Sequence, residues 1–229
     1  MKENKSDIIF FIMSVIMQMY LFKISKSGES YAFVFGVSNQ LYSSPAFCLF
    51  ELYAVIPVVF IILFFSSGTA ELINGYGKLL IIRGVSKTRI YLKKIVFVFL
   101  KITLAAFFQL IAYGLMSDKG ECNSLIRAII VYCFGILFLI QMQSFLEFFV
   151  QPNVSAMITI IYLYISYFIV CMSEKEIFRR FFILGFIFGE NNGSAYDMEL
   201  YTQIFIIYII SNVILLFFNI MKFQKSDIY

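Results

Sequence analysis

The sequence predicts an all-α, polytopic membrane protein with six transmembrane helices, and two observations carry this prediction. Apolar residues make up 61% of the 229 residues, and the mean hydropathy is +0.88. Charged residues make up only 14% and gather between the apolar runs. Soluble domains are about 45–50% apolar even with Gly counted. A soluble fold of this size therefore has too little interior to bury so much apolar surface.

The expected spans follow the apolar runs along the chain. The first run, residues 8–22, is short, but Asp7 and Lys23 at its ends can extend to the interface. No small-residue cleavage site follows it, so we interpret it as a span and not as a signal peptide. The chain is expected to form a single transmembrane domain over residues 1–229. Its other spans are predicted at residues 49–65, 95–116, 125–150, 154–172 and 203–221.

The basic residues favour one side of the membrane. Both ends of the chain carry lysines, and loop 173–202 is acidic instead. The side that holds both ends carries ten basic residues against seven on the other side, and six of the ten lie in loop 66–94, namely Lys78, Arg83, Lys87, Arg89, Lys93 and Lys94. The positive-inside rule therefore places both termini in the cytoplasm. The preference for Lys, Ile, Phe and Asn suits an AT-rich bacterial genome, so we expect a bacterial plasma membrane.

The composition excludes several kinds of catalytic site. There is no His, which removes HExxH zinc sites, Ser–His and Cys–His catalysis and His-ligated haem. The four Cys have no CxxC spacing, although Cys48, Cys122 and Cys171 fall near the outer face, where a disulfide is conceivable. The phosphate-binding pattern GxxxxGK[ST] is absent. We therefore expect a non-enzymatic chain with no cofactor or metal of its own and no nucleic-acid partner.

Loop 66–94 has the most distinctive pattern of the chain. Apolar residues recur at helical spacing from Leu72 to Leu80, and Gly84 interrupts the run. Ser86 is placed as the N-cap of a helix that begins at Lys87 and continues into the third span. Taken alone, this pattern predicts an amphipathic helix that lies on lipid headgroups, followed by a basic helix that enters the membrane.

The order of residues in this loop resembles the cytoplasmic loop of ABC-transporter type-2 permeases. An acidic residue, a Gly, Lys-Leu-Leu and then Arg-Gly-Val-Ser-Lys follow one another between the second and third expected spans. The resemblance implies a coupling helix that docks on a separate ATPase subunit. Carried over by position, the docking region contains Glu71, Gly77, Lys78, Arg83, Gly84, Ser86 and Lys87.

The resemblance also implies the rest of an assembly. Two copies of an ABC ATPase subunit would bind ATP and Mg, and a second permease chain, identical or related, would complete the pathway through the lipid bilayer. The likeness to short permeases of bacteriocin and lantibiotic gene sets implies export of a peptide, lipid-like or other amphipathic substrate, or self-immunity. Two alternatives stay open: a membrane-embedded immunity or scaffold protein without transport, and a secondary transporter.

An apolar run between the fifth and sixth spans is too short to cross a bilayer of about 30 Å. It is predicted to form a re-entrant segment, and the resembled family has an outer re-entrant hairpin at this place. The alternative is an anchor lying in the interface. The residues singled out are Phe181, Phe182, Gly185 and Gly189.

Lys101 and Glu147 are the charges expected deepest in the membrane. They lie at similar depth in the third and fourth spans, which form an antiparallel hairpin, so we expect them to pair. The alternatives are that each extends to the near interface or that the two charges take part in translocation. The polar residues inside the spans are expected to form helix–helix hydrogen bonds; they are Gln109, Gln141, Gln143, Ser144 and Asn212.

Overall fold

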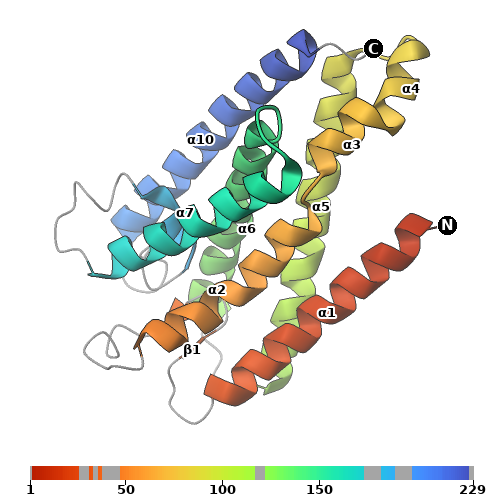
Figure 1. Cartoon of the computed structure of the whole chain (residues 1–229). Helices are drawn as coiled ribbons and strands as arrows, with labels where there is room; N and C mark the ends of the chain where they lie inside the picture. Colours follow the sequence, from red (N-terminus) through yellow and green to blue (C-terminus); the bar gives the residue numbers. More distant parts are fainter. Residues whose placement is uncertain are drawn as a thin grey trace.

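The structure is a computed structural model in which long helices form one bundle (Figure 1). Helix α1 lies at the periphery beside α2 and α5, while α6, α7 and α10 group on the other side. Two short antiparallel strands, β1 (Tyr31–Ala32) and β2 (Gly36–Val37), lie beside α2. The residues described are 2–25, 31–32, 36–37, 47–116, 122–172, 182–188 and 198–226.

In the part of the chain that the structure describes, a long helix overlaps each of the six predicted spans, but only five stretches reach membrane-spanning length. Within the described residues, five helical stretches are long and apolar enough to cross a membrane, namely Val55–Ile82, Lys87–Tyr113, Leu125–Leu146, Pro152–Val170 and Met198–Lys225. The described apolar part of α1, Asp7–Met17, is shorter. The long helices are α1 (Lys2–Ser25), α2 (Phe47–Phe64), α5 (Lys87–Met116), α6 (Cys122–Leu146), α7 (Pro152–Met172) and α10 (Met198–Lys225).

Helix α5 begins at Lys87 and continues through the predicted third span, as the sequence predicts. The hydroxyl of Ser86 accepts the N–H of Arg89 at 3.4 Å. This is the N-cap that the sequence predicts. Gly84, with φ +84°, makes the preceding turn in the left-handed region that Gly adopts without strain. The basic turn at Lys87 therefore continues directly into a membrane-length helix.

The core lies around α6, whose residues are buried on most sides. Helix α10 buries one face, with Ile204, Tyr208, Asn212 and Phe223 pointing inward. Its opposite face exposes large apolar side chains such as Phe217, which is 60% exposed. Soluble proteins rarely expose so large a contiguous apolar surface. The architecture is therefore consistent with a polytopic membrane protein whose outer faces contact lipid.

A short 3₁₀ helix, η3 (Ile183–Ile187), packs among α6, α7 and α10. Tyr208 of α10 donates a hydrogen bond from its hydroxyl to the carbonyl of Ile183 at 2.7 Å. A Cβ on Gly185 would clash with the carbonyl oxygen of Ser166, so only Gly allows this approach to α7. The described part of the predicted re-entrant segment, residues 182–188, is thus packed into the bundle. Phe181 and Gly189 lie outside the described residues.

Candidate functional site

The candidate site is the end of the bundle where the chain passes from α2 to α5. The sequence predicts one short helix here, and the structure has two, α3 (Gly68–Asn74) and α4 (Tyr76–Ile82). Gly75 separates them with φ −115° and ψ −125°, and its N–H donates to the carbonyl of Glu71 at 2.8 Å. A Cβ on Gly77 would clash with the carbonyl of Leu72, so α4 folds closely against α3. The two helices form a corner, called the α3–α4 corner below.

Glu147 attaches this corner to the bundle. It follows the last residue of α6 and is only 8% exposed. One carboxylate oxygen accepts the N–H groups of Thr69 (2.8 Å) and Ala70 (3.4 Å), and the other accepts that of Ser67 (3.1 Å). The first N–H groups of a helix have no partner within the helix, and a carboxylate is favoured at that positive end. Glu147 therefore stabilises the start of α3 from a different part of the chain.

Lys94 joins the same junction from α5. Its ammonium donates to the hydroxyl of Thr69 at 2.8 Å and to that of Ser144 at 3.4 Å. It also lies 5.6 Å from the centre of the Tyr91 ring. Residues of α3, α5 and α6 thus meet around one buried polar junction. Thr69 and Lys94 were not predicted as members of this junction, because nothing in their spacing indicates that α3 and α5 meet at the end of α6.

The predicted ion pair between Lys101 and Glu147 is wrong. Lys101 instead pairs with Asp7 of α1, with 2.5 Å between ammonium nitrogen and carboxylate oxygen. No other ion pair occurs in the part of the chain that the structure describes. The prediction rested on depth alone, but Lys101 faces α1, and Glu147 lies in the turn beyond α6, where backbone N–H groups take both of its oxygens. Lys101 also lies 4.4 Å from the centre of the Phe97 ring.

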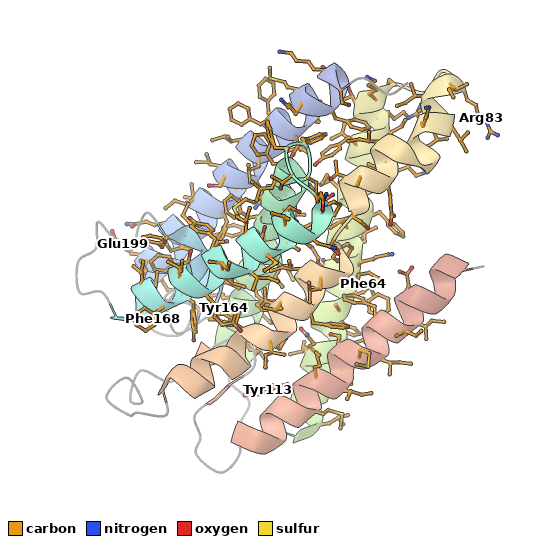
Figure 2. All side chains as sticks on the ribbon, viewed as in Figure 1. Phe64, Arg83, Tyr113, Tyr164, Phe168 and Glu199 are labelled. Atoms are coloured by element: carbon orange, nitrogen blue, oxygen red, sulfur yellow. The ribbon has the colours of Figure 1, made fainter. Side chains whose placement is uncertain are left out.

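The α3–α4 corner exposes apolar as well as charged side chains. Leu79 is 54% and Ile82 is 73% exposed, and both lie near the end of the apolar stretch Val55–Ile82. Figure 2 shows Arg83 at the outer tip of α4, pointing away from the other helices. Glu71 is also exposed, whereas Lys78 is half-buried. The corner therefore presents an apolar edge flanked by charges of both signs.

The residues expected to dock a partner have different roles in the structure. Gly77 is buried and allows α4 to fold on α3, and Gly84 and Ser86 form the turn and N-cap before α5. Only Glu71 and Arg83 among the charged members are fully on the surface.

Lys87 binds the end of α10. Its ammonium donates to the carbonyl oxygens of Ser226 (2.7 Å) and Gln224 (3.1 Å), which a helix C-terminus leaves without partners. The side-chain amide of Gln224 donates in turn to the hydroxyl of Thr88 at 2.8 Å. The two ends of distant helices, α5 and α10, are thereby fastened together next to the α3–α4 corner (Figure 1).

Buried amides connect α6 and α10. The amide of Gln141 donates to the side-chain oxygen of Asn212 at 2.9 Å, and Asn219 donates to the backbone carbonyl of Gln141 at 3.0 Å. These bonds confirm the predicted helix–helix role of Gln141 and Asn212. Gln109 and Gln143 are buried as well, but their amides have no hydrogen-bond partner among the described residues.

The described residues contain no group of three or more Cys, Asp or Glu side chains that could hold a metal ion. Cys133 is buried and free, and the side chains of Cys48, Cys122 and Cys171 lie outside the described residues. The arrangement consists of an exposed corner that hydrogen bonds of Glu147 and Lys94 attach to the ends of two long helices.

A family model described as "Protein of unknown function (DUF2705)" matches residues 11–229 of the chain. No curated protein and no solved structure matches it.

Proposed function

The chain belongs to the DUF2705 family of proteins of unknown function, and we propose that it is the membrane subunit of a bacterial ABC transporter. It would couple ATP hydrolysis by a separate ATPase subunit to export of a peptide, lipid-like or other amphipathic substrate. The resemblance of loop 66–94 to type-2 permeases supports the transporter class. The further likeness to bacteriocin and lantibiotic permeases supports the substrate class and a role in export or self-immunity.

The observation that carries the proposal is the construction of the α3–α4 corner. Its apolar edge at Leu79 and Ile82 is exposed, although such side chains at a polar surface gain free energy when a partner covers them. Arg83 and Glu71 beside this edge supply charges that fix the orientation of a partner. A docking surface of this kind suits a soluble protein subunit.

The attachment of the corner suits force transmission. Glu147 joins α3 to the end of α6, and Lys94 joins it to α5. A movement of a docked partner is therefore passed to two membrane-length helices, and not dissipated in a flexible loop. In the proposed mechanism, ATP and Mg bind only to the partner ATPase pair, and their closure shifts α5 and α6.

The proposal includes a topology. All six long helices cross the plasma membrane of a bacterium, α1 among them, and both termini lie in the cytoplasm with the α3–α4 corner. The contact of Lys87 with the end of α10 supports this placement, since it brings the C-terminal end of the chain to the same end as the corner. A second permease chain, identical or related, completes the translocation pathway.

Co-purification tests the proposed function. Tagged full-length chain is extracted from its native membrane in mild detergent, and the bound polypeptides are identified by mass spectrometry. We expect a stoichiometric ABC ATPase, and we expect Arg83→Glu or Glu71→Lys to reduce its recovery at least tenfold. Glu199→Lys is the matched control, because Figure 2 places Glu199 at the opposite end of the bundle.

Three outcomes count against the proposal. Recovery of a folded chain without any ATPase favours the scaffold or immunity alternative. Ion-driven transport by the chain alone, reconstituted in vesicles, favours a secondary transporter. Equal loss of the ATPase in the Glu199→Lys control and in the corner variants also argues against docking at the corner.

A further inference from the structure

A pocket of about 370 Å³ lies beside the α3–α4 corner, where α10 ends. Ile73 of α3 and Phe148 of the α6–α7 turn supply apolar walls. The remaining lining residues are polar or charged, and they are Glu147, Lys222, Lys225 and Ser226. The pocket therefore combines two ammonium groups with an apolar wall at one end of a membrane-length helix.

The pocket presents net positive charge. Neither Lys222 nor Lys225 forms an ion pair within the described residues, where Lys101 and Asp7 form the one pair. The carboxylate of Glu147 is turned to α3 and already accepts three backbone N–H groups, so its charge is compensated at the helix start. The two lysines are thus left to attract an anion from outside the chain.

The position of the lysines on α10 indicates the source of that anion. Both lie in the last turn of a helix long enough to cross a membrane, which is the level of lipid headgroups. Phe218 and Met221 precede Lys222 and Lys225 by four residues each and share their side of the helix. Both apolar side chains are exposed. Acyl chains can therefore lie against the apolar turn while a phosphate meets the lysines.

Lys222 is held in place for this role. Its ammonium lies 4.4 Å from the centre of the Phe149 ring, whose own side chain is exposed. A cation over an aromatic face is restrained yet keeps N–H donors for another partner.

We propose that this pocket binds the phosphate of an anionic phospholipid, with Lys222 and Lys225 as the phosphate ligands and Phe218 and Met221 as the chain contacts. The pocket is a lipid site distinct from the apolar edge at Leu79 and Ile82. The inference depends on α10 crossing the membrane and not on the transporter function, so the two can fail separately.

Lipid-dependent stability of the purified full-length chain tests the proposal. The chain is titrated in detergent micelles with phosphatidylglycerol, and separately with phosphatidylcholine, and the unfolding temperature is followed. We expect a saturable rise with phosphatidylglycerol only. In K222Q/K225Q the apparent affinity for phosphatidylglycerol is expected to fall about tenfold or more, because each lysine near a headgroup contributes a substantial share of the attraction.

Matched controls separate the site from general charge effects. R89Q/K93Q removes the same charge at the same end of the bundle but leaves the pocket intact, and it is expected to keep the wild-type response. If K222Q/K225Q does not purify as a folded chain, the exposed Lys225 alone is replaced by Gln and the affinity is measured again.

Three results overturn the inference. One is an equal response to both lipids in the wild type. Another is an unchanged phosphatidylglycerol response in the pocket variant. The third is equal protection by inorganic phosphate alone at the same concentration, which identifies an anion site that does not need a lipid.

Discussion

The carboxylate of Glu147 accepts the backbone N–H of Thr69 at 2.8 Å, across 78 residues of sequence. This bond fixes the start of a seven-residue helix, α3, which is too short to be stable by itself in water. The α3–α4 corner therefore owes its position to a charged residue in a different loop.

Replacement of Glu147 tests this attachment in a graded way. Ser67 and Thr69 donate to different oxygens of the carboxylate, so Gln can keep only one of these acceptors and Ala keeps none. Loss of a helix cap costs about 0.5–2 kcal/mol, and about 1 kcal/mol shifts the unfolding temperature of a domain this size by roughly 2–4 °C. We expect Glu147→Ala to lower it by several degrees, and Glu147→Gln by less.

Hydrogen exchange over residues 68–82 locates the effect of the same replacements. Exchange is expected to accelerate in this segment and to stay unchanged in α7. A uniform acceleration along the chain is the contrary result, because it would mean that Glu147 supports the whole bundle and not the corner.

Charge exchange tests the pair formed by Lys101 and Asp7. Single reversals, Asp7→Lys or Lys101→Asp, place two like charges together between α1 and α5 and are expected to reduce the yield of folded protein several-fold. The double reversal is expected to restore much of it. The yield is measured by fluorescence-detected size exclusion.

The control for this charge exchange uses Glu147 in place of Asp7. Combined reversal of Lys101 and Glu147 leaves both residues without a matching partner, so no rescue is expected. Rescue by that combination, without rescue by the pair with Asp7, contradicts the observed contact.

Cysteine cross-linking tests the contact between the ends of α5 and α10. The side-chain nitrogen of Gln224 lies 2.8 Å from the hydroxyl oxygen of Thr88, so Cys at both positions comes within reach of a short bis-methanethiosulfonate cross-linker. In a variant without the four native Cys, we expect this reagent to cross-link Thr88→Cys with Gln224→Cys rapidly. Mobility on a non-reducing gel reports the product.

A second Cys pair supplies the control for cross-linking. Thr88 lies beside the C-terminal end of α10, and Glu199 lies in its first turn. No intramolecular product is therefore expected for Thr88→Cys with Glu199→Cys. Absence of the product for Thr88 and Gln224 in native membranes is the result that argues against the contact of Lys87 with the α10 terminus.

Replacement of Gly185 tests the packing of η3. A Cβ at this position meets the backbone of Ser166 and the side chain of Val170, so Gly185→Ala forces η3 away from α7. Overpacking of this kind typically costs about 1–3 kcal/mol. We expect a lower unfolding temperature in detergent, and a larger decrease for Gly185→Val.

Gly84 provides a comparison for that experiment. A Cβ there meets no atom within 4 Å, but its φ of +84° is strained for other residues, so Gly84→Asn is expected to be tolerated. If Gly185→Ala is as mild as Gly84→Asn, η3 is not packed tightly in the membrane.

The helix starts and breaks around α5 were predictable because they depend on neighbouring residues. Ser86 caps α5 and Gly84 makes the turn before it, as local sequence rules require. The second break, at Gly75, was not predicted. Gly77 was predicted as part of a docking region. In the structure this position requires Gly, because a side chain would clash with the carbonyl of Leu72 where α4 folds on α3. Sequence spacing does not indicate this contact.

The partners of the charged residues could not be predicted from depth in the membrane. Lys101 and Glu147 were matched by their distance from one end of the bundle. The rotation of each helix decides instead which neighbour a residue faces. Lys101 faces Asp7 of α1, and Glu147 binds backbone N–H groups at the start of α3. Lys87 likewise contacts α10 across 139 residues, a relationship that sequence spacing does not encode.

The sequence by itself determined that the chain forms long apolar helices, because the period and length of apolar runs depend only on local backbone geometry and transfer from water. The tertiary structure alone decided which polar groups meet. That choice depends on the rotation and crossing of whole helices, and in this bundle it brings α3, α5 and α6 together at Glu147 and Lys94.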